Sequence, residues 1–416
     1  MYRSLMKSIL RICLLWLLIQ EGYGLTLGEA ECIAINRADE IRQFEAKGQS
    51  LQAQAISEGQ LPDPNIQISP LNFPVDTFNF SQEPMTQFQF GINQDIPKGK
   101  TLLYRYRRTH NKSMSSLHQK DNQRLLILKA VREQWDLLYF WQRSEQILLG
   151  QRKTFKHLKD VASSLFSNNK VPQKDVLNAQ LELTQIEERL IQVRQAIDDT
   201  RVNLARWIGQ KAAYRASASL VMDNKKVVLS KVSKKMLLGH PVIKADNSDI
   251  NSAISSIAIS KQDYLPGFSL GAAYGVRSGR NINGNKRPDF LTGQVKISLP
   301  LFPKDRQDKK LLANQRELSS LKAKRYADLK GLNRVLGTNI VDYKRTREKL
   351  SLYSRRLLPE AKQYANSTLI AYQNDKTDFL TVALGYIRWL DIELAEVKEQ
   401  VNHSKAGINI LYLQGR

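Results

Sequence analysis

Two stretches of the chain alternate between apolar and polar residues, which is the pattern of a β-strand with one apolar face. The first contains Phe88, Phe90 and Ile92, and the second, about two hundred residues later, contains Val295 and Ile297. Each follows a shorter segment that opens with Leu-Pro, and a polar loop lies between the two. The pattern predicts four strands, at about 64–73, 86–96, 267–276 and 290–300.

Long helical patterns follow the second strand of each pair. The first runs over about 100–167, breaks near Pro172 and continues over 173–208. In this last segment and near the end of the chain, apolar residues recur at alternating spacings of three and four, which is coiled-coil periodicity. The two stripes are Val176, Ala179, Leu183, Ile186, Leu190, Val193, Ile197, Thr200, Leu204, Trp207 and Leu380, Ala383, Ile387, Leu390, Leu394, Val397, Val401, Ser404, Ile408, Leu411.

The order of elements repeats, so the chain is a tandem duplication. Each half reads helix, strand, loop, strand, long helix, tight turn, long helix. We expect a first repeat over 25–210, a linker over 211–240 and a second repeat over 241–416. The tight turns lie at about 166–175 and 372–378, and the second is expected to be about three residues shorter.

The N-terminus has the features of a cleaved signal peptide. Arg3, Lys7 and Arg11 surround the start of an apolar run that ends at Ile19, and small residues follow up to Gly24. Eight apolar residues are too few to span a bilayer. We therefore predict a signal peptide over 1–24 and export of the chain.

Cleavage near Gly24 would remove Cys13 and leave Cys32 as a single cysteine. Acidic residues precede Cys32, so we expect a core residue and no lipid anchor. The formal charge of +23 over 416 residues is scattered along the helices. It allows a basic surface on an exported protein or a nucleic-acid binder, but the latter predicts a basic stripe with interleaved aromatics and no export signal.

Residues for catalysis or cofactor binding do not gather at a useful spacing. There is no glycine-rich phosphate loop, and the acidic pair Glu187-Glu188 lies on a helix that its apolar stripe already explains. We expect a protein that is not an enzyme, with no cofactor and no metal site. The five histidines are dispersed, at His110, His118, His157, His240 and His403.

The four strands raise the question of what covers their apolar faces. An ordinary half-buried sheet is one answer, and a membrane sheet is the other. An exported chain can reach an outer membrane, where every backbone group must be paired and an open sheet edge is not viable. Four strands cannot close a barrel, since the smallest outer-membrane barrels have about eight. If the strands lie in a membrane, several chains must therefore share one barrel.

Several short motifs, in this order, resemble the TolC-like outer-membrane efflux protein family over nearly the whole mature chain. Those motifs are Leu25-Thr-Leu-Gly-Glu-Ala30, Leu61-Pro-Asp-Pro64, Thr86 to Gly99, His240-Pro241, Tyr264-Leu-Pro266, Leu299-Pro-Leu-Phe302 and Asp378-Phe-Leu380. The resemblance implies a homotrimer with a shared twelve-stranded β-barrel in the outer membrane and a periplasmic α-barrel of long helices. The branch of the family that serves heavy-metal efflux pumps is favoured by two segments, Asn72-Phe-Pro74 and Glu83 to Gln87.

The resemblance also implies a function: the passive exit duct of a tripartite pump. Its partners would be outer-membrane lipid, a periplasmic adaptor protein and an inner-membrane pump of the RND or ABC type. The two tight turns would form the periplasmic tip, which docks the adaptor and narrows to a gate. The docking residues would be Asn169, Lys170, Asp175, Asn374, Asp375 and Lys376.

The gate would be lined by Asp378, for which a helix cap is an equally good explanation. Thr381 stands where the family has a second aspartate, so the ring of acids would be single. Tyr372 matches a family tyrosine that tethers the closed tip by a hydrogen bond, although a plain packing role fits it too. The alternative to a duct is an exported or cytoplasmic basic coiled-coil scaffold without enzymatic activity.

Overall fold

The structure is a computed structural model that describes residues 24–224, 227 and 233–416. The predicted signal peptide, apart from Gly24, and Cys13 lie outside the described residues. The chain divides into two compact units, each of which draws on both halves of the sequence. Unit 1 contains the residues up to Ile41, Asn122–His240 and Gly331–Arg416, and unit 2 contains Arg42–Asp121 and Pro241–Lys330.

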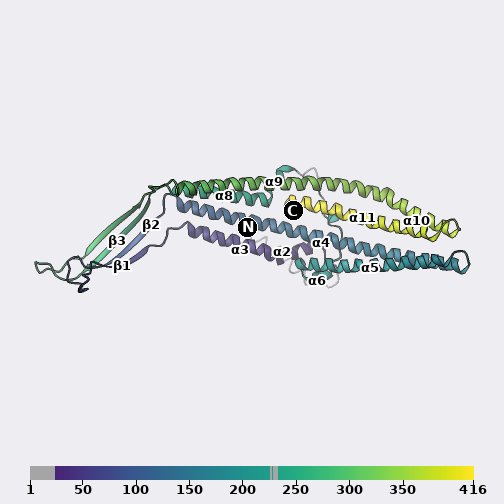
Figure 1. Cartoon of the computed structure of the whole chain (residues 1–416), viewed down its shortest axis with the longest axis horizontal. Helices are drawn as coiled ribbons and strands as arrows, with labels where there is room; N and C mark the ends of the chain where they lie inside the picture. The colour runs from purple at the N-terminus through teal and green to yellow at the C-terminus, as the bar shows by residue number, and fades with distance from the viewer. Residues whose placement is uncertain (1–23, 225–226, 228–232) are drawn as a thin grey trace, which may run out of the picture. The chain divides into compact units, whose positions relative to one another are not determined.

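Unit 2 contains one antiparallel sheet of four strands in the order β1-β2-β3-β4 (Figure 1). The strands are β1 (Asn65–Leu71), β2 (Gln87–Ile96), β3 (Gly267–Arg277) and β4 (Phe290–Ser298). The strands from the two halves meet at the β2–β3 pairing, where Phe90 lies opposite Tyr274. Within the described chain, β1 and β4 each have one neighbour and therefore one open edge.

The sheet has one apolar face and one polar face, because strand side chains alternate. The register places on one face Ile66, Ile68, Phe88, Phe90, Ile92, Phe268, Leu270, Val276, Leu291, Val295 and Ile297, interrupted by Gln94. The other face carries Gln67, Ser69, Gln89, Asn93, Asp95, Ser269, Thr292, Gln294 and Lys296. The apolar side chains are largely exposed in the single chain, up to 82% for Leu291.

Long helices follow the strands in both halves. In the first half, α4 (Thr101–Ser167) is continuous over 67 residues, and α5 (Gln173–Ile208) follows it. In the second half, α9 (Gln307–Leu352) leads through a π-helical turn, η3 (Tyr353–Leu357), into α10 (Leu358–Gln373), and α11 (Phe379–Leu413) follows. No helix in the described part of the chain is long and apolar enough to cross a bilayer.

The shorter helices precede the strands or lie between the halves. They are α2 (Leu27–Arg37), α3 (Asp39–Glu58), α6 (Gln210–Tyr214), α7 (Val221–Asn224), η2 (Lys234–Gly239) and α8 (Pro241–Gln262). The first motif of the mature chain explains the start of α2. The backbone N–H of Thr26 donates to Glu29 Oε2 at 2.8 Å, and the N–H of Glu29 donates back to Thr26 Oγ1, which is a capping box.

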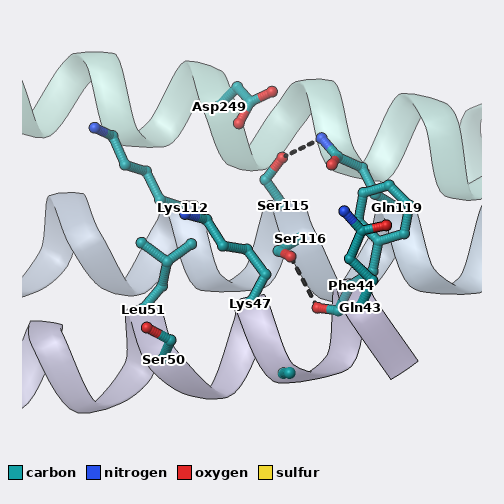
Figure 2. Close-up of a pocket in the computed structure, with 11 residues that line it drawn as sticks. Gln43, Phe44, Lys47, Ser50, Leu51, Lys112, Ser115, Ser116, Gln119 and Asp249 are labelled. Atoms are coloured by element: carbon teal, nitrogen blue, oxygen red, sulfur yellow. Dashed lines mark hydrogen bonds between the residues drawn. The ribbon is translucent and has the colours of Figure 1, made fainter. Parts of the chain in front are cut away.

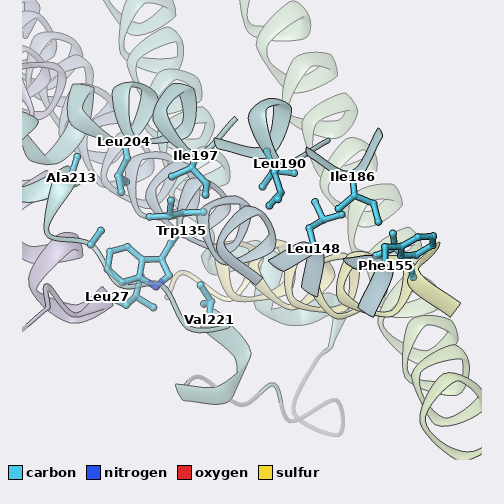
Figure 3. Packing of buried hydrophobic residues seen from close by; sticks show 14 of the residues in the cluster. Leu27, Trp135, Leu148, Phe155, Ile186, Leu190, Ile197, Leu204, Ala213 and Val221 are labelled. Atoms are coloured by element: carbon cyan, nitrogen blue, oxygen red, sulfur yellow. The ribbon is translucent and has the colours of Figure 1, made fainter. Parts of the chain in front are cut away.

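The main hydrophobic core lies in unit 1, where α4, α5 and α11 supply most of the buried side chains (Figure 3). Trp135 and Leu148 of α4 pack with Ile186, Ile197 and Leu204 of α5. The predicted stripe of α5 forms this contact, and seven of its ten members are fully buried: Ala179, Ile186, Leu190, Val193, Ile197, Thr200 and Leu204. The α5 periodicity therefore reports a real helix–helix interface.

The predicted stripe of α11 is wrong at its first member. Leu380 is exposed, whereas the second member, Ala383, is buried. Phe379, Val382 and Tyr386, which lie outside the predicted stripe, are buried as well. From Leu390 onward the predicted positions and the buried ones agree at Val397, Ser404, Ile408 and Leu411.

The fold class predicted from the sequence is confirmed: long helices, a small antiparallel sheet and a duplicated element order. The duplication has a constant offset, because α4 begins at Thr101 and α9 at Gln307, 206 residues later. The helical stretches 101–167 and 307–373 both contain 67 residues. The second stretch differs from the first because it contains a π-helical turn. None of the side chains in this turn is buried, and Pro359 follows it.

Candidate functional site

The two tight turns of unit 1 have the same backbone structure. Five residues separate α4 from α5, and five separate α10 from α11, so the expectation of a shorter second turn is wrong. In the first turn, the N–H of Lys170 donates to Leu165 O at 2.9 Å. In the second, the N–H of Lys376 donates to Ala371 O, also at 2.9 Å. Together with the bonds of the preceding residues, these are Schellman motifs, which close the C-terminus of a helix.

Each Schellman motif needs a residue in the left-handed conformation, which is usually glycine. Here the residues are Asn169, with φ of 55°, and Asp375, with φ of 57°. Asn and Asp tolerate this conformation better than other non-glycine residues. Before them, the side-chain amides of Asn168 and Asn374 each donate to the carbonyl four residues back, at 2.8 Å. The sequence Asn-Asn/Asp-Lys thus recurs at the 206-residue offset.

The helices that leave the turns begin differently. The N-cap of α5 is Pro172, which offers no side-chain cap, whereas the N-cap of α11 is Asp378. Asp378 Oδ1 accepts from the N–H of Thr381 at 3.0 Å and from its hydroxyl at 2.6 Å. The capping role weighed for Asp378 from the sequence is therefore present. These bonds, foremost that of the Thr381 hydroxyl, lower the pKa of the Asp378 carboxyl.

A buried hydrogen bond connects the two helical hairpins. The hydroxyl of Tyr372, on the last turn of α10, donates to Asp175 Oδ2, on the first turn of α5, at 3.2 Å. The exposed fractions of these residues are 2% and 4%. The ring of Tyr372 also packs edge-on against Phe379, with centroids 5.7 Å apart. Burial, and then the charge of Asp175, raise the pKa of the Tyr372 hydroxyl, which stays protonated as a donor.

The other predicted tip residues are exposed in the turns. Asn169, Lys170, Asn374, Asp375 and Lys376 are all solvent-accessible, whereas Asp175 is buried beneath them against Tyr372. At the 206-residue offset, Asp175 is the counterpart of Thr381, and Pro172 is the counterpart of Asp378. Sequence reasoning named Tyr372 and Asp175 but did not connect them. The constant offset between Asn168 and Asn374 is the signal that aligns the two turns.

Unit 2 has an open groove of about 660 Å³ between α3, α4 and α8 (Figure 2). One hydrogen bond crosses it, from Ser116 Oγ of α4 to Phe44 O of α3, and a second lies within α4, from Gln119 Nε2 to Ser115 Oγ. Its lining combines two lysines and Asp249 with neutral polar and apolar side chains. Across the described residues, no group of three or more His, Cys, Asp or Glu side chains is placed to hold a metal ion.

Solved structures with the same fold are outer-membrane proteins. The chain matches CusC, described in the context of transmembrane channel formation, with a TM-score of 0.79 at 13% identity, covering 95% of both chains. It matches the outer membrane protein VceC of Vibrio cholerae with 0.77 at 14% identity, covering 94% of this chain and 96% of that one. The outer-membrane channel MtrE of Neisseria gonorrhoeae, in its open state, gives 0.75 at 13%, covering 94% and 88%.

The chain therefore has the fold of outer-membrane channels of the TolC type, over nearly its whole described length, and the resemblance inferred from the sequence motifs is confirmed at the level of fold. No protein-family model matches the sequence, and a search of curated proteins finds no match. A channel fold agrees with the expectation of a protein that is not an enzyme.

Proposed function

We propose that this protein is the outer-membrane exit duct of a tripartite efflux pump. The observation that carries the proposal is the two-faced sheet, whose exposed apolar face and polar face suit lipid on one side and water on the other. The alternative, a basic coiled-coil scaffold, would not require a sheet with an exposed apolar face. The fold shared with outer-membrane channels supports the same function.

The open sheet edges support a shared barrel. In lipid, the unpaired backbone groups of β1 and β4 would each cost several kcal/mol. Pairing β4 of one copy with β1 of the next removes both edges. Three copies of four strands give twelve strands, which is the homotrimeric barrel that the sequence resemblance implies. The protein would then reside in the outer membrane, with its helices in the periplasm.

The tip of unit 1 supports a gate. Tyr372 and Asp175 would hold the α10–α11 hairpin against α5 in the closed state, and release of this bond would accompany opening. Asp378 would supply one carboxylate per chain to a ring of three, which attracts cations and repels anions. Thr381 would add no second acidic ring, because its side chain is neutral; its hydroxyl donates to Asp378 instead.

The exposed turn residues support docking of a periplasmic adaptor. Lys170 and Lys376 stand at equivalent positions of the two turns, so each chain would offer two similar basic contacts to the adaptor. Energy would come from an inner-membrane pump of the RND or ABC type, as the resemblance implies. Heavy-metal cations are the proposed cargo, on the motifs at Asn72-Phe-Pro74 and Glu83 to Gln87. A duct would pass them without a resident metal site.

A planar-bilayer recording of the purified protein tests the proposal. We expect discrete conductance steps with cation selectivity. The open probability should be low, because the hydrogen bond between Tyr372 and Asp175 would hold the tip closed. A protein that never produces steps in bilayers at concentrations where other outer-membrane channels insert would contradict the duct. Steps with anion selectivity would leave the duct standing and would remove Asp378 from the gate.

A further inference from the structure

The passages from strand to helix share a short residue pattern in both halves of the chain. Ile96-Pro97-Lys98-Gly99-Lys100 precedes α4, and Phe302-Pro303-Lys304-Asp305-Arg306 precedes α9. The offset is again 206 residues, so an apolar residue, a proline, a lysine and a second cation recur in register. The proline ends the sheet ladder in each case, because it has no N–H to donate.

The helices that follow have diverged almost completely, which makes this similarity informative. At the same offset, four of the 67 positions in 101–167 and 307–373 are identical, namely Ser113, Leu126, Asp136 and Lys156 with their counterparts. The two passages have therefore kept their pattern of an apolar residue, a proline and two cations, whereas the helices have lost almost all sequence identity. A fold requirement accounts for the prolines and for Lys98, which bonds to the carbonyl of Asp263, but not for Lys100, Lys304 and Arg306.

The first passage and the first turn of α9 lie close together in unit 2, because both contact Asp263. Lys98 Nζ donates to Asp263 O at 3.1 Å, and Lys310 Nζ, on the first turn of α9, reaches Asp263 Oδ2 at 2.7 Å. The backbone N–H of Lys100 donates to the neighbouring Gln262 at 3.0 Å. We call the resulting cluster the basic collar; it consists of Lys98, Lys100, Lys304, Arg306, Lys309 and Lys310.

The basic collar is poorly placed for helix stability. Helix N-termini favour negative charge, and cations there are unfavourable. The first turn of α4 has no acidic residue at all. Four carboxylates, those of Asp95, Asp263, Asp305 and Asp308, lie among the six cations, so the cluster has a formal charge of +2. Asp263 is bonded to Lys310, and Asp308 accepts from the Tyr264 hydroxyl. Lys100, Lys304, Arg306 and Lys309 are exposed. The collar therefore has cationic charge that the fold itself does not neutralise.

Exposed apolar residues lie directly beside the collar. Leu299, Leu301 and Phe302 are 61%, 70% and 85% exposed, in the irregular segment between β4 and Lys304. They continue the apolar face of the sheet, which ends nearby at Ile96 and Phe268. Lys98 is two residues beyond Ile96, so it lies within about 7 Å of the end of the apolar face. An apolar face bounded by cations matches the border between acyl chains and headgroups.

We infer that the basic collar binds the headgroups of anionic phospholipids at the membrane surface from which the helices emerge. The inference rests on the proposed function, which places the apolar face of the sheet in lipid. Lys and Arg supply charge for phosphate, while Leu301 and Phe302 reach into the adjoining acyl region. In a trimer the collar would form a ring of eighteen cations, six from each chain.

Native mass spectrometry of the purified full-length protein in mild detergent tests the inference, with phosphatidylglycerol and phosphatidylcholine as probes. We expect the wild type to retain phosphatidylglycerol at a concentration about tenfold lower than phosphatidylcholine, and the collar variant to lose this preference. The collar variant carries Lys100→Gln, Lys304→Gln, Arg306→Gln and Lys309→Gln, and it leaves the bonded Lys98 and Lys310 intact. The control variant removes four exposed cations elsewhere on α4 and α9: Lys153→Gln, Lys156→Gln, Lys322→Gln and Lys344→Gln.

The control variant should keep the wild-type preference. A collar variant that still prefers phosphatidylglycerol would overturn the inference, and so would a control variant that loses the preference equally, since net charge alone would then decide. Inorganic phosphate at millimolar concentration should not displace the lipid; displacement would indicate a site for free anions instead. If the proposed function itself is wrong, the result is different: the protein is a monomer, binds neither lipid and is absent from outer membranes.

Discussion

The hydroxyl of Tyr372 donates to the carboxylate of Asp175 across 197 positions of the chain, and both side chains are almost fully buried. The bond joins the α10–α11 hairpin to the first turn of α5. Its burial matters because a carboxylate without a partner is costly away from water, so Asp175 and Tyr372 depend on each other.

Replacing Tyr372 with Phe should loosen this connection while keeping the aromatic packing against Phe379. The lost hydrogen bond is worth about 1–3 kcal/mol, because it leaves the Asp175 carboxylate buried and unpaired. We expect larger or more frequent conductance steps and greater entry of large antibiotics. The control is Tyr364→Phe, on the exposed face of the same helix. Equal currents for wild type and Tyr372→Phe would contradict a role of this hydrogen bond in closing the tip.

Substitutions of Asp378 separate its cap from its proposed gate. Asp378→Ala removes both cap and charge and should cost about 1 kcal/mol of stability, whereas Asp378→Asn keeps a good cap without the charge. If the carboxylate lines the gate, both variants raise conductance and lower cation selectivity, but only Asp378→Ala lowers the melting temperature. A wild-type current in Asp378→Asn would leave the residue with its capping role alone.

Charge reversal in the turns should weaken adaptor binding. Lys170→Glu and Lys376→Glu change exposed side chains of two equivalent Schellman motifs without altering backbone bonds. We expect each to reduce the recovery of the adaptor in a pull-down severalfold, and the double variant to reduce it further. Lys156→Glu, on the exposed surface of α4, is the matched control. Undiminished recovery with the double variant would exclude the turns as a basic docking surface.

Glycine at the left-handed positions should stabilise the turns. Asn169→Gly and Asp375→Gly remove the strain of a side chain at positive φ, worth about 1 kcal/mol each, whereas Ala at the same positions should destabilise. Thermal unfolding followed by circular dichroism checks the order Gly, then wild type, then Ala. A glycine variant that melts below the wild type would show that side-chain contacts of Asn169 or Asp375 matter more than backbone strain.

Asp136 on α4 should make stability depend on pH. Burial raises the pKa of its carboxyl to about 7, with Asp223 and Glu133 adding to the rise and the bond from the Val221 N–H opposing it. The unfolded chain loses this proton near pH 4, whereas the folded chain keeps it to about pH 7. The folded state therefore loses up to about 4 kcal/mol as pH rises through this window.

Asp136→Asn lacks this titration. We expect the melting temperature of the variant, relative to wild type, to rise between pH 5 and pH 8 and then to level off. A difference in melting temperature that stays constant over this range would show that the carboxyl titrates normally.

The sequence predicts the strands and long helices well because their apolar faces are built on simple periods. Period two fixes the sheet faces, and the heptad spacing of α5 fixes its buried stripe. The heptad spacing fails at Leu380 of α11, because the neighbouring Phe379 takes the buried position next to Tyr372. Local patterns cannot show which of several helices a residue will contact.

The tip illustrates the same limit. The resemblance gives Tyr372 a hydrogen bond, but choosing Asp175 as the acceptor requires knowing that the end of α10 packs against the start of α5. The turn bounds expected from the sequence, 166–175 and 372–378, made the second turn look short. The structure shows that Asp175 corresponds to Thr381, and both turns then have equal length. The π-helical turn at Tyr353–Leu357 has no sequence period that would reveal it.

The proposed duct requires that three copies of this chain share one barrel in the outer membrane. The mass of the cross-linked protein, extracted by detergent from purified outer membranes, tests this requirement. We expect a species of three chains. A monomer, or a protein found only in soluble fractions, would mean that the four strands form a sheet within a single chain and that the protein is not a duct.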